Sequence, residues 1–363
     1  MTARVMIMAG GTGGHVFPAL AVANELRSRG VEVFWLGTRN GLEAKVVPEA
    51  GIDIEWVSIS GLRGKGLIGW LLAPFRLTNA IAQSVAIIFR RRPMAVLGMG
   101  GFVSGPGGFV TWLLRKPLLI HEQNAIAGLT NRLLAKMAGK VLEAFPGTFK
   151  DIKSVIALGN PVREEIAALP EPAERFAKRD GALRLLVVGG SLGAQALNEI
   201  VPQAIAMMDA KQRPEVWHQA GQRNIEAAQA QYKALGVDGR VNAFIDDMAE
   251  AYGWADIVIC RSGALTVSEL AAAGVGALLV PFPYAVDDHQ TANARYLADA
   301  DAAQLLPQAA LSPESMKNRL SELMDDCQQG REQLLVMAQK ARALAKPEST
   351  RCVADLCMEA TNG

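Results

Sequence analysis

The chain has 363 residues, a formal net charge of +1, 50% hydrophobic residues and 20% charged residues. That length is sufficient for two buried cores, and so average a composition excludes a disordered or fibrous protein. The four cysteines have no CxxC spacing, so neither a disulfide scaffold nor a zinc site is expected. We also expect no export leader and no membrane-spanning segment, because no basic leader and no uninterrupted run of about 18 apolar residues occurs.

Short apolar runs alternate with longer helical patterns, which predicts an α/β protein. In the first half, strands are expected at residues 5–8, 33–36, 54–57, 95–98, 118–121 and 141–143, with helices at 19–29 and 79–89. In the second half, strands are expected at 183–188, 216–219, 241–244, 257–260 and 277–280, and Gly274 ends a helix over 266–273. The resulting domains are residues 1–160 and 183–340, joined by a proline-rich linker at 161–182. A final helix within 341–363 is expected to pack back on the first domain.

A glycine-rich turn follows the first expected strand of each half. These turns are Gly10–Gly14 and Gly189–Gly193. A strand that runs through such a turn into a helix presents backbone amides, which bind diphosphates well. The pair predicts two Rossmann-like domains facing across a cleft. A dinucleotide fingerprint is not complete, because its third glycine and the acid ending the second strand are missing, and no Gly-Lys-Ser/Thr occurs for an ATP P-loop.

Charge is unevenly distributed along the chain. Residues 1–160 hold 18 Lys and Arg against 9 Asp and Glu, a balance of +9, whereas residues 161–363 hold 19 against 27, a balance of −8. No acidic residue lies between Glu55 and Glu122. This pattern predicts a positive face on the first domain, for nucleic acid, a polyanionic ligand or an anionic membrane.

An apolar run with basic neighbours lies inside the acid-free segment. Aromatic residues among cations are typical of a membrane interface, whereas binding of single-stranded nucleic acid needs more stacking rings than 6% aromatic content supplies. An ordinary buried helix is the alternative interpretation. The expected membrane patch comprises Arg63, Lys65, Leu67, Ile68, Trp70, Leu71, Leu72, Phe75 and Arg76.

Nine motifs, in order along nearly the whole chain, resemble the MurG family of peptidoglycan glucosaminyltransferases. They are GGTGGH at 10–15, SGLRGKG at 60–66, GMGG at 98–101, GPGG at 105–108, HEQN at 121–124, GNPVR at 159–163, GGS at 189–191, CRSGALTVSE at 260–269 and DDHQ at 287–290. The resemblance implies the glycosyltransferase-B fold. It also implies transfer of N-acetylglucosamine, with inversion, from UDP-N-acetylglucosamine to the 4-hydroxyl of the undecaprenyl-diphosphoryl muramoyl-pentapeptide, lipid I, to form lipid II.

The resemblance further implies which residues bind each substrate. The acceptor diphosphate would meet Gly13, Gly14, Gly100, Gly101 and Gly105. The donor would meet Thr12, Gly13, Gly14, Asn124, Arg163, Ser191, Ile245, Arg261, Ala264, Leu265, Thr266, Val267, Ser268, Glu269 and Gln290. Ile245 would hold uracil through its backbone, Gln290 would contact the transferred sugar, and Arg261 would screen charge on the leaving group.

Two of these residues have competing interpretations. His15 follows the first glycine turn and could accept the proton of the acceptor hydroxyl, or it could only orient the acceptor or serve as a buried structural residue. Glu269 would bind the donor ribose according to the resemblance. From the residues alone, however, Thr266-Val267-Ser268-Glu269 also fits a capping box, in which Glu269 bonds to the backbone at Thr266.

The aspartate pairs Asp246-Asp247 and Asp287-Asp288 suggest a metal site, yet helix dipoles and amides usually stabilise departing UDP in this fold. We therefore expect no required cofactor or protein-bound metal, with divalent ions able to assist from solution. Leu192 and Gly276 depart from the family's usual Gln and Pro. A UDP-sugar epimerase and a non-catalytic lipid-diphosphate carrier remain alternatives. The expected location is peripheral, on the cytoplasmic face of the bacterial inner membrane, with a cell-wall synthesis or division complex as a candidate partner.

Overall fold

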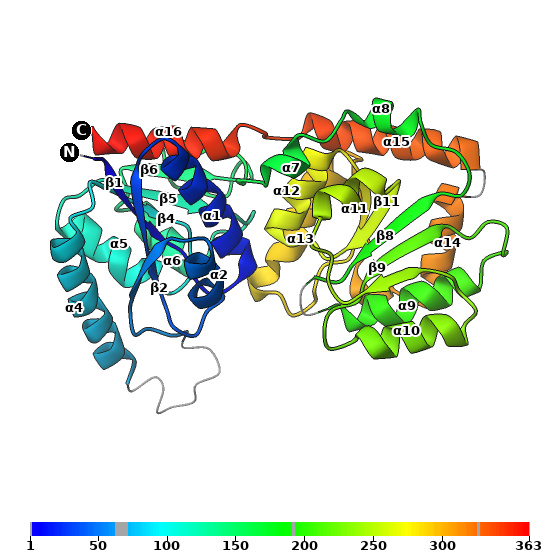
Figure 1. Cartoon of the computed structure of the whole chain (residues 1–363), viewed down its shortest axis with the longest axis horizontal. Coiled ribbons are helices and arrows are strands. Elements are labelled where there is room, and N and C mark those ends of the chain that lie inside the picture. The colour runs from blue at the N-terminus through cyan, green and yellow to red at the C-terminus, as the bar shows by residue number, and fades with distance from the viewer. Residues whose placement is uncertain (1, 62–71, 191–192, 325–326, 363) are drawn as a thin grey trace. The chain divides into compact units, whose positions relative to one another are not determined.

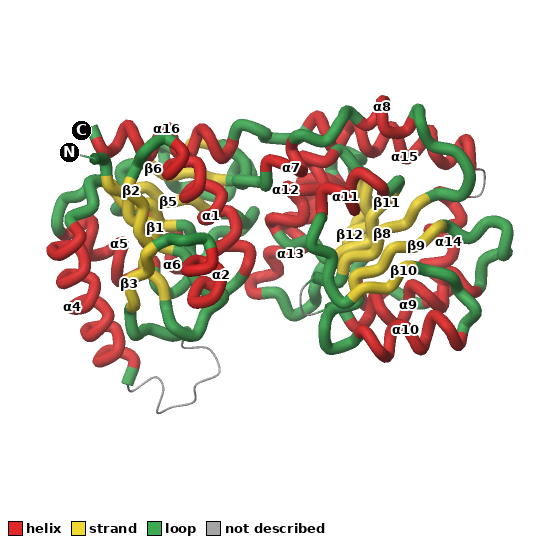
Figure 2. The backbone as a smooth tube through the Cα atoms, in the orientation of Figure 1, coloured by secondary structure: helices red, strands yellow, loops and turns green. Residues whose placement is uncertain are grey.

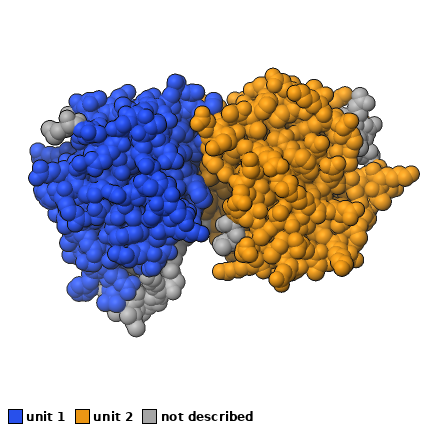
Figure 3. Space-filling model, in the orientation of Figure 1, with its two compact units in different colours: residues 1–162, 347–363 blue, residues 163–346 orange. Residues whose placement is uncertain are grey.

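The computed structural model describes residues 2–61, 72–190, 193–324 and 327–362. These residues form two compact units (Figures 1 and 3), the first comprising Met1–Val162 with Pro347–Gly363 and the second Arg163–Lys346. The segment at 161–182, expected to be a linker, contains α7 (Glu164–Ala167) and α8 (Pro172–Phe176). From Arg163 onward it belongs to the second unit.

Among the described residues, the first unit holds a seven-stranded sheet in the order β3-β2-β1-β4-β5-β6-β7. Every pair in it is parallel. The edge strand β7 was not expected from the sequence. It is only three residues long, so its apolar run is too short to recognise. The strands are β1 (Arg4–Met8), β2 (Glu32–Gly37), β3 (Asp53–Trp56), β4 (Ala95–Gly98), β5 (Leu118–Glu122), β6 (Lys140–Glu143) and β7 (Val155–Ala157).

Side chains alternate between the two faces of this sheet, and helices cover each face (Figure 2). Val5 and Ile7 of β1 pack in one core with α1 (Gly13–Ser28) and α16 (Ser349–Thr361). Met6 and Met8 pack in a second core with α4 (Ala73–Arg91), α5 (Ser104–Leu113) and α6 (Leu129–Ala135). The C-terminal helix α16 therefore completes the core of the first unit, where it contacts α1.

The second unit repeats the plan with a parallel sheet of six described strands in the order β10-β9-β8-β11-β12-β13. The strands are β8 (Arg184–Val188), β9 (Glu215–Gln219), β10 (Arg240–Asn242), β11 (Ile257–Cys260), β12 (Gly276–Leu279) and β13 (Ala303–Leu305). One face packs on α9 (Gln195–Ala206), α14 (Pro313–Met324) and α15 (Cys327–Ala343). Besides α7 and α8, the described part of this unit also holds the α-helices α10 (Ile225–Ala234), α11 (Met248–Trp254), α12 (Ala264–Ala273) and α13 (His289–Ala298) and two 3-10 helices, η1 (Val286–Asp288) and η2 (Gln308–Ala310).

Each sheet reverses its strand order once, between β1 and β4 in the first unit and between β8 and β11 in the second. In open α/β sheets the ligand crevice lies outside the carboxyl ends of the strands at this switch point. The glycine-rich turns follow those same strands: Gly10–Gly14 follows β1, Gly100–Gly101 follows β4, and Gly189–Gly190 follows β8. The strand order thus assigns one candidate site to each unit.

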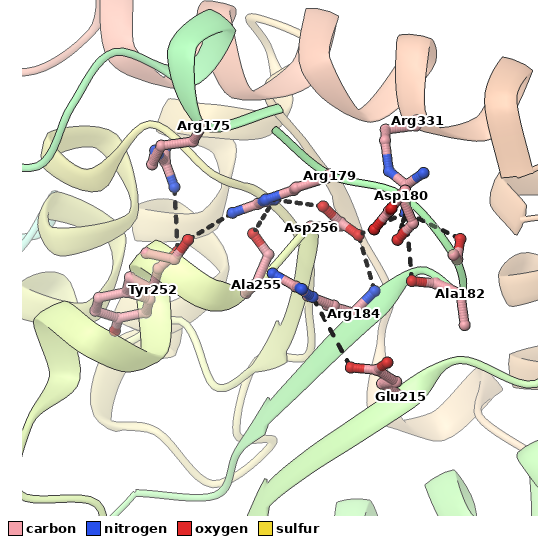
Figure 4. A network of polar contacts seen from close by, with 12 residues as sticks. Arg175, Arg179, Asp180, Ala182, Arg184, Glu215, Tyr252, Ala255, Asp256 and Arg331 are labelled. Atoms are coloured by element: carbon pink, nitrogen blue, oxygen red, sulfur yellow. Dashed lines mark hydrogen bonds and ion pairs between the residues drawn. The ribbon is translucent and has the colours of Figure 1, made fainter. Parts of the chain in front are cut away.

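A buried charge network supports the start of β8 (Figure 4). Asp256 is fully buried and accepts hydrogen bonds from the Arg179 guanidinium and, at 2.9 Å, from the backbone amide of Arg184. Arg331 lies 3.7 Å from the same carboxylate. Arg179 also donates to the Gly253 and Ala255 carbonyls, so the segment after α8, the end of α11, α15 and β8 all meet at one carboxylate.

We expect Asp256→Asn to destabilise the second unit by about 3 to 5 kcal/mol, because Arg179 would be left buried without its counter-charge. Denaturant unfolding, followed by tryptophan fluorescence, measures the change. The matched control is Glu322→Gln, which breaks an exposed ion pair with Arg319 and should cost less than about 1 kcal/mol. Equal losses in the two variants would contradict a structural role for the buried network.

Candidate active site

The first glycine loop is held by a buried carboxylate that the sequence analysis missed. Glu43, in the first turn of α2 (Glu43–Glu49), accepts from the Gly11 amide at 2.9 Å and from the Thr38 amide and hydroxyl at 3.0 and 2.7 Å. It lies six residues beyond β2, whereas the dinucleotide fingerprint places its acid at the end of that strand. The Gly11 amide already donates to Glu43. The amides of Gly13 and Gly14 are therefore the ones that the start of α1 presents for a ligand.

The second glycine loop lies directly against the first. A Cβ at Gly101 would collide with the carbonyl oxygen of Gly10, and Gly101 has a φ of +85°. Gly100 has a φ of +98°. Gly105 stands in the first turn of α5, where its amide donates to the Phe102 carbonyl at 3.3 Å. The expected acceptor residues of the first unit are therefore gathered at its switch point, but the Gly105 amide already has an acceptor.

His15 occupies the first turn of α1, beside these loops. Its Nδ1 lies 2.7 Å from Oε1 of Gln123, which follows β5. A Cβ at Gly100 would come within 2.8 Å of the same Nδ1, so only a glycine leaves room for the ring. His15 is partly exposed and Gln123 is buried. The hydrogen bond to Gln123 thus fixes the imidazole at Nδ1.

Asn124 is oriented by its neighbour Glu122. The Asn124 amide and its Nδ2 donate to one carboxylate oxygen of Glu122 at 3.0 and 3.1 Å. The other oxygen accepts from the Gly128 amide and from Asn131 Nδ2 at 3.1 and 2.9 Å. Within the HEQN motif, Glu122 therefore has a structural role, which neither its residue type nor its spacing indicated.

In the second unit, α12 begins at Ala264, and Gly263 is its N-cap residue without a side-chain cap. The first helical bond runs from the Val267 amide to the Gly263 carbonyl at 3.0 Å. Thr266 therefore lies inside the helix, and the capping box considered for Glu269 is not formed. Ala264, Leu265 and Thr266 form the helix start, next to the switch point. The fully buried Val267 supports this turn, since its amide is already used.

Glu269 lies one turn further along α12 and is buried. One of its oxygens lies 2.9 Å from Arg163 Nη2, and the other accepts from the Tyr252 hydroxyl at 3.2 Å. Burial raises the pKa of Glu269, and the Arg163 guanidinium opposes that rise. Arg163 and Glu269, which the sequence analysis assigned to one substrate, thus form an ion pair, and Tyr252 is a partner that it missed.

Three further donor-site candidates make backbone contacts. Gln290 Oε1 accepts from the Phe282 amide at 2.9 Å. Arg261 donates to the carbonyls of Val280 and Pro281, both at 3.2 Å, and to Gln308. Its hydrogen bonds therefore brace the segment after β12, and its expected role in screening leaving-group charge stays a prediction. The Ile245 amide donates to Gln219 Oε1 at 3.0 Å, so this backbone donor is already used within the second unit.

Other expected residues have local roles or lie outside the described part of the chain. Asp247 caps α11 by accepting from the Glu250 amide at 2.8 Å, and Asp288 accepts from the Thr291 hydroxyl at 2.7 Å. Within the described ranges, no group of three His, Cys, Asp or Glu could hold a metal ion. Thr12 is the N-cap residue of α1, and its side chain makes no capping hydrogen bond. Ser268 lies on α12, partly exposed. The residues outside the described ranges are Ser191, Arg63, Lys65, Leu67, Ile68, Trp70 and Leu71.

Comparison with known proteins agrees with this arrangement of two units. Residues 5–143 match the glycosyltransferase family 28 N-terminal domain, and residues 184–349 match the corresponding C-terminal domain.

Two full-length relatives are named UDP-N-acetylglucosamine–N-acetylmuramyl-(pentapeptide) pyrophosphoryl-undecaprenol N-acetylglucosamine transferase. The one from Nitrosococcus oceani is 58% identical, with 100% of both chains covered, and the one from Marinobacter nauticus is 56% identical, with 99% of this chain and 98% of the relative covered. A crystal structure of Acinetobacter baumannii MurG is 43% identical, with a TM-score of 0.85 over 98% of this chain and 99% of that one. The chain therefore belongs to glycosyltransferase family 28 and, within it, to the MurG family, with two Rossmann-like domains of the glycosyltransferase-B fold.

Proposed function

We propose that this protein transfers N-acetylglucosamine from UDP-N-acetylglucosamine to the 4-hydroxyl of lipid I and so forms lipid II. Two observations together carry the proposal. Each unit has a glycine-lined switch point, and the whole chain is more than 50% identical to relatives that are named as this transferase. The first unit would bind the acceptor diphosphate through Gly13, Gly14, Gly100 and Gly101. The second would bind the donor.

The reaction is a single displacement at the anomeric carbon of the donor sugar. The acceptor oxygen forms a bond to that carbon on the face opposite UDP, the bond from carbon to diphosphate oxygen breaks, and UDP leaves with the electron pair. The hydroxyl proton passes to His15. Inversion at the sugar follows from the single step.

Charge develops on the departing diphosphate. The first amides of α12, at Ala264, Leu265 and Thr266, point from a helix N-terminus, where the dipole favours an anion. We propose that these amides stabilise UDP without a required protein-bound metal and that Arg261 acts mainly by bracing the segment that carries Phe282. Glu269 would accept from the ribose hydroxyls, with Tyr252 and Arg163 holding the carboxylate in place.

The activity test is incubation of the purified protein with labelled UDP-N-acetylglucosamine and a lipid I analogue. A labelled disaccharide on the acceptor supports the proposal. Formation of an epimeric sugar without that product would identify an epimerase, and binding of lipid without turnover would identify a carrier.

We further propose that the first unit binds peripherally to an anionic membrane. Helices α4, α5 and α6 follow one another in contact, and together with Leu72, the N-cap residue of α4, they expose large apolar side chains: Phe75, Leu77, Phe89, Phe109, Trp112, Leu113, Leu129 and Leu133. Of the expected patch, Leu72, Phe75 and Arg76 are described, and they lie at the start of α4. No helix among the described residues is both long and apolar enough to cross a bilayer. Exposed apolar surface beside an acid-free segment favours interfacial attachment.

Glu269→Gln is expected to raise the donor KM by roughly 30- to 150-fold, since leaving buried hydroxyls without a charged acceptor costs on the order of 2 to 3 kcal/mol. The acceptor KM should stay nearly unchanged. Tyr252→Phe is the control, because it removes one hydrogen bond to Glu269 and keeps the carboxylate; steady-state kinetics should show a change of only a few fold. If Glu269→Gln lowers Tm with the donor KM intact, Glu269 serves only to hold its neighbours.

His15→Ala is expected to lower kcat by roughly 100-fold or more, because the acceptor hydroxyl would lose its proton acceptor. Saturating both substrates separates this effect from binding. A variant with normal kcat and only a raised acceptor KM would reduce His15 to a binding residue.

The triple variant Phe75→Ser, Leu113→Ser, Leu129→Ser should weaken binding to vesicles rich in anionic lipid by at least about tenfold, because each apolar side chain contributes roughly 1.5 to 3 kcal/mol when it enters the interface. These side chains are 75%, 56% and 64% exposed, so folding should be preserved. High salt should weaken binding as well. The matched control, Met207→Ser with Val336→Ser on the second unit, should bind normally; equal loss in both variants would contradict a localised membrane surface.

A further inference from the structure

We propose that Gln123 and His121 are positioning residues that fix His15 in the tautomer protonated at Nδ1, which keeps its Nε2 unprotonated and ready to accept a proton. The inference rests on the role proposed above for His15 and adds the reason why the correct nitrogen is available. It follows from a chain of hydrogen bonds within the first unit, each with only one possible direction.

The chain begins at a backbone carbonyl. His121 Nε2 lies 2.9 Å from the Gly159 oxygen, which can only accept, so this nitrogen carries a hydrogen. His121 is fully buried, and burial lowers its pKa to about 4, so the ring is neutral near pH 7. Its Nδ1 therefore has a lone pair and accepts.

The Gln123 side chain is oriented by two acceptors. Its Nε2 lies 3.1 Å from His121 Nδ1 and 3.2 Å from the His121 carbonyl oxygen. The reverse orientation would place the amide oxygen of Gln123 against that carbonyl oxygen, with no hydrogen between them. The NH₂ group consequently faces His121, and Oε1 faces His15.

The final link is between Gln123 Oε1 and His15 Nδ1, which are 2.7 Å apart. An amide oxygen only accepts, so His15 Nδ1 must donate. The ring lies so close to Gly100 that a Cβ there would come within 2.8 Å of Nδ1 and 2.9 Å of Cε1, so only glycine fits beside it. A neutral imidazole with its hydrogen at Nδ1 has its lone pair at Nε2. The Gly159 carbonyl thus determines, through three hydrogen bonds, which nitrogen of His15 can act as a base.

The second unit contains the opposite arrangement, which serves as an internal reference. Asn198 Nδ2 donates to the Ala220 carbonyl at 2.9 Å, so Asn198 Oδ1 faces His218 Nε2 at 3.0 Å. His218 Nδ1 lies 2.9 Å from the Tyr232 hydroxyl. The same reasoning gives His218 its hydrogen at Nε2.

The direct test is the ¹⁵N NMR spectrum of protein labelled in its four histidines, with each signal assigned by a single His→Gln variant. Near pH 7.5 we expect the Nδ1–H pattern for His15 and the Nε2–H pattern for His121 and His218. An Nε2–H pattern for His15 would overturn the proposal. This measurement needs no turnover, so it remains decisive if the proposed activity fails.

The functional test compares Gln123→Met with Ser349→Ala. Gln123→Met removes the acceptor for His15 Nδ1 and should convert His15 to a mixture of tautomers, with kcat reduced roughly 10- to 100-fold and both KM values changed less than about threefold. Ser349 donates to the same Gly159 carbonyl at 2.9 Å but is no link in the chain, so Ser349→Ala should lower Tm without changing kcat or the His15 signal.

An unchanged kcat in Gln123→Met, or equal kcat losses in the two variants, would overturn the positioning role. A normal kcat in His15→Ala would instead overturn the base role itself, and the wild-type spectrum would still report the tautomer.

Discussion

The site of the first unit depends on how closely the backbones of its two glycine loops approach each other at the switch point. Gly101 lies so near Gly10 that a Cβ would collide with the Gly10 carbonyl, and the left-handed φ of Gly100 and Gly101 turns the second loop away from β4. The second unit has the same constraint, because a Cβ at Gly193 would collide with the Ala220 carbonyl. Parallel strands bring these loops together, and only glycine lets them meet. The placement of amides and of His15 depends on this approach.

Buried polar side chains then hold the loops in place. Glu43 fixes the first glycine loop, Glu122 fixes the turn after β5, and Asp256 fixes the entry to β8. Each carboxylate accepts several hydrogen bonds, some from backbone amides, which offsets the cost of burying its charge. Burial of this kind orients the neighbouring groups more narrowly than an apolar contact would, because a hydrogen bond restricts direction as well as distance.

Within the candidate sites, residue types alone gave an incomplete account. Arg163 and Glu269 are paired, and Tyr252 completes their contact. Arg261, expected to screen charge on the leaving group, also donates to two carbonyls and a glutamine, which the residue type did not indicate. The residue type of Gln123 indicated no role, although its side chain connects two histidines that lie 106 positions apart in the chain.

The sequence by itself determined the α/β class, eleven of the strands to within about two residues at their ends, and the glycine turns, because these depend on local periodicity and on backbone freedom. It also supported the family through motifs that keep their order. Only the tertiary structure decided that Thr266 lies inside α12, that β7 and β13 complete the sheets, and that α5 and α6, like α4, expose large apolar side chains. It alone decided the partners of Glu43, Gln123 and Glu269. The physical reason is that a hydrogen bond between distant residues depends on strand order and burial, which leave no periodic signal in the chain.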